Sequence, residues 1–230
     1  MLLSFQNNIL KRGDTVEKHY KEMIKEIIPE EERLRIRQII DHGFELVNQF
    51  YVRKENRFLC NPVGNDLRAH LIRSAIAFCA EREYPVEGNR FFSYIYKGNA
   101  ICNCHHIELK SATVTVLFAL ANSPNDTGND SIYRHNVMEN LQQNLFEEEE
   151  REENINALVV TYGIASSDEP NFVVLGIPEK KGWRGSIPLV KPDSKNKNQV
   201  ITTEETEEFL AKLADNVLEE GGLVNGGKES

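Results

Sequence analysis

The side chains most able to do chemistry gather between Ile101 and Leu120, in the stretch ICNCHHIELKSATVTVLFAL. Successive side chains of a strand point to opposite faces of its sheet. The alternate positions of Ile101–Leu109 are half apolar and suit a core, and Thr113–Phe118 predicts a second, mostly buried strand. The other positions would align groups that can bind metal ions or protons: Cys102, Cys104, His106, Glu108 and Lys110.

Glu108 and Lys110 form a Glu-x-Lys pair on one face of the first strand. A carboxylate and an ammonium so placed can hold a divalent cation and orient an attacking water at a phosphodiester. The predicted order of elements over Asn65–Tyr162 is a helix, a three-stranded meander, a helix and a strand, and it is similar to the core of the PD-(D/E)XK nucleases. The resemblance implies that Glu108 binds Mg²⁺ and that Lys110 positions or activates the nucleophile.

Two departures separate the chain from that family pattern. The family has an acid on the preceding strand, and Phe91–Tyr96 offers none. The Glu-x-Lys pair also ends the second strand of the meander and not the third. Glu81 or Glu83, on the helix before the meander, would have to supply the missing ligand. The alternative is that Glu108 and Lys110 are an ordinary surface pair of a strand.

The sequence CNCHH at positions 102–106 offers a second site, because zinc takes cysteine and histidine ligands in a tetrahedron. Cys102, Cys104 and His106 would supply three ligands from one strand face, and Cys60, Cys79 or another histidine the fourth. Structural zinc sites usually combine two short paired spacings, and the second pair is missing here. The alternative is two small thiols packed in a sheet. A Cys104–His106 nucleophile is a third option, but it requires an activated thiol.

Two further features are candidates for binding a partner. Trp183 and Arg184 stand between glycines, and an exposed tryptophan beside an arginine is typical of interface hot spots. Alternatively, Trp183 folds back onto the core, as most large aromatic side chains do. The acidic run Glu147–Glu153 is either a contact surface that imitates phosphates or the solvated end of a helix.

Helical spacing of apolar residues predicts three helices, over Asp14–Ile28, Pro29–Tyr51 and Asn65–Glu83. Asn61–Gly64 predicts a turn, and Asn65 predicts the N-cap of the third helix.

Within the second helix, Gly43 costs about 1 kcal/mol of helix stability and would allow a bend. Arg33, Arg35 and Arg37 stand near three glutamates, so we predict a solvated face of mixed charge.

The strands expected around the opening stretch are Phe91–Tyr96 before it and the hairpin Asn156–Tyr162 and Phe172–Ile177 after it. Lys97–Ala100 predicts a hairpin turn, a helix would start near Ser131, and Pro178–Pro192 is expected to be irregular. Thr202 and Glu205 have the spacing of a capping box for a last helix, with Phe209, Leu213 and Val217 on one face.

Together these elements predict an α+β fold: N-terminal helices packed on one mixed, mostly antiparallel sheet of about five strands, followed by a C-terminal helix. A single domain would cover residues 1–190, with its helical part at 14–84 and its sheet part at 90–190. Residues 191–220 would form a linker and the last helix, and residues 221–230 a disordered tail.

The net charge of −9 is unevenly distributed. Residues up to His135 contain 18 basic and 17 acidic side chains, so the acidic excess lies in the remainder. Nucleic-acid binding needs clustered Lys and Arg, which leaves the N-terminal part as the candidate nucleic-acid surface. No apolar run is long enough to span a bilayer and the N-terminus lacks a secretory pattern, so we expect a cytoplasmic protein.

The sequence lacks the motifs of phosphate-binding loops, dinucleotide sites, zinc proteases and esterases. We therefore predict a non-enzymatic interaction or regulatory protein whose partner is another protein, with the acidic run and Trp183 as contact surfaces. The alternative is a Mg²⁺-dependent DNA nuclease of the PD-(D/E)XK kind, for which the resemblance implies a role in restriction or phage defence. Mg²⁺ belongs to the nuclease interpretation, and Zn²⁺ to the cysteine–histidine cluster.

Overall fold

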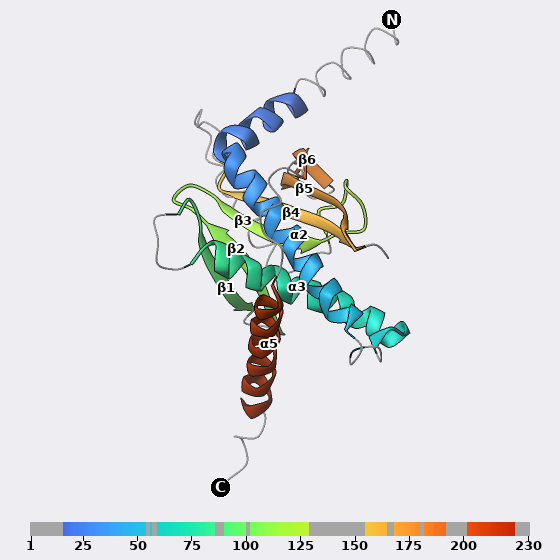
Figure 1. The fold of residues 1–230 in the computed structure, drawn as a ribbon. Helices are drawn as coiled ribbons and strands as arrows, with labels where there is room; N and C mark the ends of the chain where they lie inside the picture. The colour runs from blue at the N-terminus through green and yellow to red at the C-terminus, as the bar shows by residue number, and fades with distance from the viewer. Residues whose placement is uncertain are drawn as a thin grey trace, which may run out of the picture.

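The computed structural model describes residues 16–53, 56, 59–85, 90–99, 102–128, 155–164, 168–179, 182–191 and 202–223, with side chains except at 63, 65, 97–99, 102–105 and 215–223. The described strands form one sheet, α2 and α3 lie on one of its faces, and α5 projects from the body (Figure 1). The predicted α+β class is confirmed.

Three helices precede the sheet. Residues 16–27 form the first, and α2 (Glu30–Val52) follows Pro29, its N-cap residue. α3 (Pro62–Glu83) begins earlier than predicted, because Asn61 and not Asn65 is its N-cap. The Asn61 side chain accepts a hydrogen bond from the Gly64 N–H at 2.9 Å, and Pro62 occupies the first turn, where its missing N–H costs nothing.

α2 and α3 approach each other closely at Gly43. A Cβ at this position would lie 2.6 Å from Ile76 Cγ1 and 2.9 Å from the Ile76 backbone nitrogen. The role of this glycine is therefore close helix packing. Arg35 adds an ion pair across the same two helices, with 2.7 Å between its Nη1 and Glu83 Oε1.

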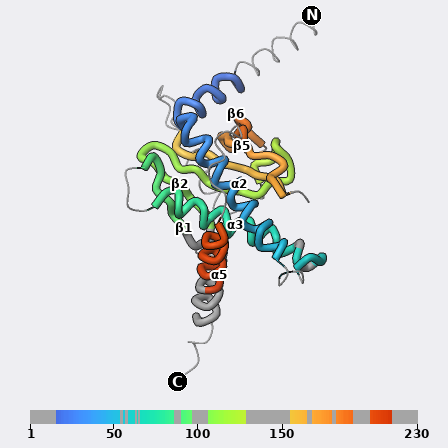
Figure 2. Tube along the Cα trace, viewed as in Figure 1, coloured from blue at the N-terminus to red at the C-terminus, as the bar shows by residue number. Residues whose placement is uncertain are grey.

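The described strands form a six-stranded sheet whose spatial order equals their order in the chain. In Figure 2, β1 and β2 lie on one side of the molecule and β5 and β6 on the other. Neighbouring strands are antiparallel except β3 and β4, which are parallel. The strands are β1 (Ser93–Asn99), β2 (Cys102–Lys110), β3 (Thr115–Leu120), β4 (Ala157–Ile164), β5 (Pro170–Glu179) and β6 (Gly182–Pro188).

β6 shows that one prediction was wrong, because Pro178–Pro192 was expected to be irregular and contains this strand. Its glycines had suggested a loop, but Gly185 has a packing role, because a Cβ there would lie 2.5 Å from Tyr20 Cβ. The glycine lets the edge strand approach the first helix closely. β6 pairs antiparallel with β5, with Ile187 opposite Leu175.

The two faces of the sheet have different partners. Alternate residues of the central strands join the core cluster that contains the buried residues of α2 and α3, among them Ile107, Leu109, Val116, Leu158, Val160 and Leu175. The positions between them point to the opposite face. Leu117, Val159 and Thr161 are buried there but are not part of that cluster.

The C-terminal helix α5 (Thr203–Leu223) begins with the predicted capping box. The Thr202 N–H donates to Glu205 Oε2 at 2.9 Å, and the Glu205 N–H donates to Thr202 Oγ1 at 3.2 Å. Phe209 is buried beside Phe78 of α3, with 5.6 Å between ring centroids, and Leu213 also packs on the core. Val217 of the predicted apolar face lies among the residues whose side chains are not described.

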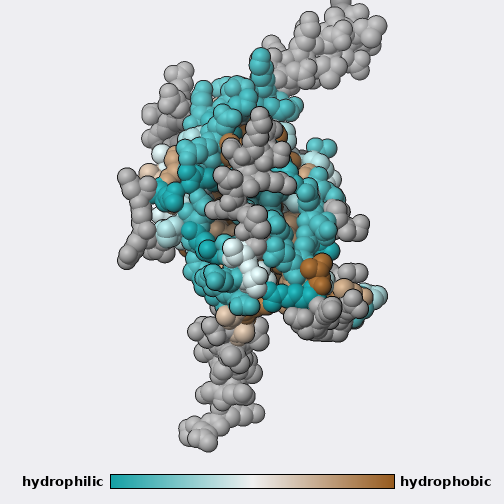
Figure 3. Space-filling view, viewed as in Figure 1, coloured by the Kyte–Doolittle hydropathy of each residue, from teal (hydrophilic) through white to brown (hydrophobic). Residues whose placement is uncertain are grey.

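The surface that Figure 3 displays is mostly hydrophilic, with small hydrophobic areas between polar ones. None of the helices within the described ranges combines the length and the apolar character needed to cross a membrane.

We predict that Gly43→Ala destabilises the protein, although alanine favours helix formation by about 1 kcal/mol. The added Cβ would overlap Ile76, and overpacking of this kind costs about 1–3 kcal/mol. Denaturant unfolding should therefore give a lower midpoint for the variant. Glu45→Ala, at an exposed position of the same helix, is the control that should leave the midpoint nearly unchanged. A midpoint raised by Gly43→Ala would contradict the packing argument.

Candidate functional site

Glu108 is a buried carboxylate on the sheet face opposite α2 and α3. Its side chain is 8% exposed, and its Oε1 lies 2.9 Å from His106 Nε2. Its neighbours along the strand, Ile107 and Leu109, belong to the helix-covered core. Strand alternation therefore places His106 and Glu108 on the same face, as predicted. The two side chains contact each other, although the sequence had assigned them to separate metal sites. A buried carboxylate needs polar partners, and the imidazole of His106 is one of them.

Lys110 lies on the same sheet face as Glu108, at the exposed end of β2. Glu81 lies elsewhere. Its carboxylate contacts Lys212 of α5, with 2.9 Å between Oε2 and Nζ. Burial raises the pKa of the Tyr94 hydroxyl, and the negative charge of Glu81 raises it further by a smaller amount. Tyr94 pairs with Leu109, whose side chain is on the helix-covered face. The structure thus places Glu81 and Glu108 on opposite faces of the sheet.

The zinc prediction is tested only in part. β2 carries Cys102, Cys104 and His106 on one strand, but the two cysteine side chains are outside the described residues. Within the described part of the chain, no group of three or more histidine, cysteine, aspartate or glutamate side chains is arranged to hold a metal ion. Zinc binding by this strand stays a prediction.

Cys60 and Cys79 stand in opposite environments. Cys60 is exposed, whereas Cys79 packs against the core between α3 and α5. Burial raises the pKa of the Cys79 thiol from its ordinary value of 9.0 to about 12, and nearby Arg82 opposes this rise only weakly. Cys79 is thus a structural thiol, because metal binding and nucleophilic attack both need the thiolate.

Trp183 is half-buried and takes part in the packing of the sheet edge. Its indole N–H donates a hydrogen bond to the Pro124 carbonyl oxygen at 2.9 Å. A Cβ on Gly176 would lie 2.6 Å from the Trp183 ring, so the ring lies over that glycine. Arg184 lies against the first helix, with its guanidinium 5.7 Å from the centre of the Tyr20 ring. The acidic run Glu147–Glu153 lies outside the described residues.

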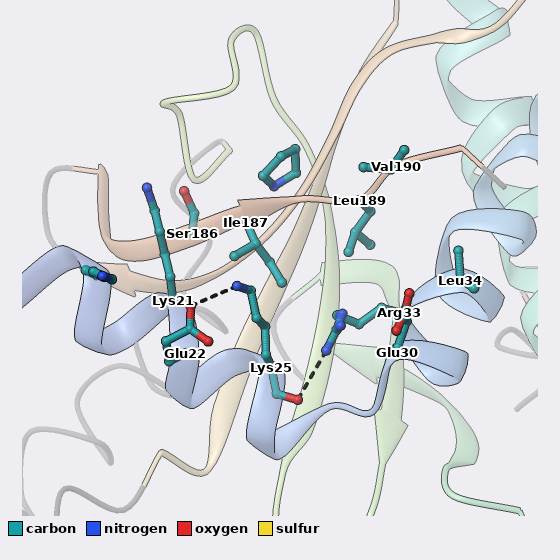
Figure 4. A pocket seen from close by; sticks show the side chains of 12 residues that line it. Lys21, Glu22, Lys25, Glu30, Arg33, Leu34, Ser186, Ile187, Leu189 and Val190 are labelled. Carbon is teal, nitrogen blue, oxygen red and sulfur yellow. Dashed lines mark hydrogen bonds and ion pairs between the residues drawn. The ribbon is translucent and has the colours of Figure 1, made fainter. Parts of the chain in front are cut away.

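A groove of about 400 Å³ lies between the first two helices and the end of β6 (Figure 4). Its helical side carries both signs of charge, and its strand side is mainly apolar. Figure 4 shows the lysines and Glu22 along the helix, facing the strand residues across the opening. Its charged lining residues are Lys18, Lys21, Glu22, Lys25, Glu30 and Arg33, and its other lining residues are Leu34, Ser186, Ile187, Pro188, Leu189 and Val190.

Arg37 positions the strand side of this groove, which corrects the prediction that it is solvated. It is 9% exposed, and its Nη1 donates to the Leu189 carbonyl oxygen at 2.6 Å. Its Nε lies 3.0 Å from both carboxylate oxygens of Asp41, one turn along α2. The Leu189 N–H donates to the Val173 carbonyl oxygen at 2.9 Å, so Leu189 is held from two sides.

Sequence reasoning did not find this groove. Its two sides are about 160 residues apart in the chain, and β6 had been predicted to be irregular. The available local signal was the spacing of Lys18, Lys21 and Lys25, which places all three on one side of a helix. That spacing shows a basic stripe but not the apolar strand opposite it.

Comparison with known protein families gives no matching family model for this chain. Searches of the curated proteins and of the solved structures likewise give no significant match.

We predict that Cys60 reacts with a thiol reagent in the native protein and that Cys79 does not. The comparison needs a Cys102→Ser/Cys104→Ser background, so that only these two thiols remain. At pH 8 the thiolate of Cys79 should be scarcer by about a thousandfold than that of an ordinary cysteine, given its raised pKa. Mass spectrometry of timed alkylation measures both rates. Equal rates in the folded protein would rule out the buried environment of Cys79.

We also predict that Arg37→Leu destabilises the protein by about 3 kcal/mol. The substitution leaves the half-buried Asp41 carboxylate without its cation and the Leu189 carbonyl without its donor. Chemical denaturation measures the decrease in the free energy of unfolding. Arg90→Leu, at an exposed arginine, is the matched control. A difference of less than about 0.5 kcal/mol between the two variants would show that Arg37 does not hold the strand in place.

Proposed function

We propose that this chain is a non-enzymatic binding protein that holds another protein in the groove between residues 18–34 and 186–190. The observation that carries the proposal is the lining of the groove: basic side chains along one wall and an apolar strand segment along the other. Protein interfaces commonly combine an apolar centre with a polar rim. A binding role needs only these contacts and no reactive group.

The arrangement of Glu108 also supports a binding role. His106 contacts the Glu108 carboxylate, with 2.9 Å between Nε2 and Oε1. Glu81, the expected further ligand, instead pairs with Lys212 of α5. The groove is at the opposite end of the sheet from β2, four strands away. At the usual spacing of strands this separates it from Glu108 by about 19 Å.

The proposal is tested by comparing partner capture by three tagged proteins: the wild type, a Lys18→Glu/Lys21→Glu variant and an Arg73→Glu/Arg90→Glu variant. Lys18, Arg73 and Arg90 are exposed, the Lys21 side chain is 40% exposed, and both double variants change the net charge by the same amount. We expect a partner that the wild type and the control retain and that the groove variant loses. Partners captured equally by all three would reject the groove as the binding surface.

A nuclease remains the second candidate because of two observations. β3 and β4 are parallel, as the helix–meander–crossover order of the PD-(D/E)XK core requires, and Glu108 and Lys110 share one face at the end of β2. In this interpretation Glu108 would bind Mg²⁺ and Lys110 would assist the attacking water.

Calorimetric titration of wild type and Glu108→Gln with Mg²⁺ and with Zn²⁺, followed by incubation with plasmid DNA and Mg²⁺, distinguishes the two candidates. We expect no Mg²⁺ binding that depends on Glu108 and no cleavage, because His106 already contacts that carboxylate. Cleavage that Glu108→Gln abolishes would replace the binding proposal with the nuclease. Zinc binding lost in a Cys102→Ser/Cys104→Ser variant would instead establish the cysteine site.

A further inference from the structure

We infer that the groove takes an acidic peptide segment with an apolar side chain between its carboxylates. The inference rests on the proposed function, which it deepens by naming the chemistry of the partner. It follows from the charge of the helical wall and the exposure of the strand wall.

The basic side chains of the helical wall follow a regular pattern. Lys18, Lys21 and Lys25 are separated by three and four residues, so they form one stripe along the helix, and Arg33 stands at its end. The stripe from Lys18 to Lys25 extends over about 10 Å, which equals about three residues of extended peptide. Carboxylates two or three residues apart in a ligand would match its spacing.

The acidic residues of this wall leave the lysines available to a ligand. Lys25 Nζ lies 2.8 Å from Glu22 Oε1, and Lys21 Nζ lies 2.7 Å from Glu17 Oε1. All four side chains are 40–55% exposed. Exposed ion pairs of this kind contribute little to stability, so a ligand carboxylate can exchange with them at low cost.

Arg33 has a different role from the lysines, because it is held in place. Its Nη1 donates to the carbonyl oxygens of Lys25 at 3.1 Å and Ile28 at 2.5 Å, at the end of the first helix. Figure 4 shows this guanidinium between the two helices, next to the groove. A positive charge fixed in this way needs no ordering when a ligand binds.

The strand wall supplies an apolar contact. Ile187 and Leu189 are buried, whereas Val190 beside them is 72% exposed and Pro188 is also exposed. The apolar surface thus continues from the core to the rim of the groove. A leucine-sized side chain of a ligand could cover Val190 while its flanking carboxylates reach the lysines.

A nucleic acid fits this lining less well than an acidic peptide does. Glu22 and Glu30 would repel any anion, but a phosphate backbone has no apolar side chain to place against Val190, and the described lining residues include no aromatic ring on which a base could stack. The net charge of the chain, −9, also opposes a polyanion. A short peptide meets mainly the local lysines, because salt screens the distant charges over about 8 Å.

The test uses fluorescence anisotropy with a labelled peptide of sequence Glu-Glu-Leu-Glu-Glu and with its counterpart in which glutamine replaces every glutamate. We expect the acidic peptide to bind the full chain and the glutamine peptide to bind at least about tenfold more weakly. Lys18→Glu/Lys21→Glu should reduce binding by a similar factor, and Arg73→Glu/Arg90→Glu should leave it unchanged. Val190→Ser, a milder change at an exposed position, should weaken binding of the acidic peptide without affecting the fold.

Equal binding of the two peptides, or no loss in the lysine variant with its circular dichroism unchanged, would overturn the inference. A single-stranded DNA oligonucleotide that binds more tightly than the peptide, with loss in the same variant, would replace the peptide with a nucleic acid. If captured partners depend on the groove but the acidic peptide does not bind, this inference fails and the proposed function stands. Cleavage of DNA that depends on Glu108 is the separate result that removes the proposed function.

Discussion

The placement of α2 against the sheet depends on the buried charge of Arg37. Burying a guanidinium away from water is costly, and the cost is offset only where the charge is paired and its N–H groups have acceptors. Asp41 supplies the counter-charge from the same helix, and the Leu189 carbonyl supplies an acceptor from the segment after β6. Because that acceptor is 152 residues away in the chain, satisfying Arg37 brings the two ends of the domain together. This contact ties α2 to Leu189, which lines the strand side of the groove.

Strand alternation governs the chemistry of β2 as firmly as Arg37 governs the groove. Ile107 and Leu109 must face the helices to complete the core, so Glu108 must face away from them. A catalytic acid contributed by α3 would lie on the wrong face, which is where Glu81 lies. A metal centre built on Glu108 would have to recruit its other ligands from the face that carries Leu117 and Val159. The requirements of the core therefore limit which residues can cooperate in a reaction.

Local signals in the sequence predicted local structure well. The capping box of Thr202 and Glu205 is formed as its spacing predicts, because both partners lie within one helical turn. The predicted N-cap of α3 was a few residues too late, because Asn61 and Asn65 have the same side chain. Only Pro62, which suits the first turn of a helix, favours Asn61 as the cap. The α+β class followed from periodicity, which averages over many residues and tolerates such errors.

Contacts between distant segments were beyond local reasoning. Arg37 shares its helix surface with glutamates, so its composition suggested solvent exposure, and only the Leu189 carbonyl explains its burial. Gly185 likewise suggests a loop in the sequence, whereas in the structure it allows close packing of the strand against Tyr20. In both cases the deciding partner lies more than 150 residues away. The two sides of the groove likewise come from segments that are distant in the chain, so no local sequence motif predicts it.

The exposed apolar rim of the groove supports the proposed peptide ligand. Val190 is 72% exposed although it adjoins Leu189, which is buried, so the core ends at a surface that could have been closed or made polar. Covering such an apolar side chain is favourable by about 25 cal/mol for each Å² removed from water. The lysines opposite it keep the same surface soluble while it is empty. An exposed apolar strip flanked by cations matches a ligand of complementary pattern, in which carboxylates flank an apolar side chain.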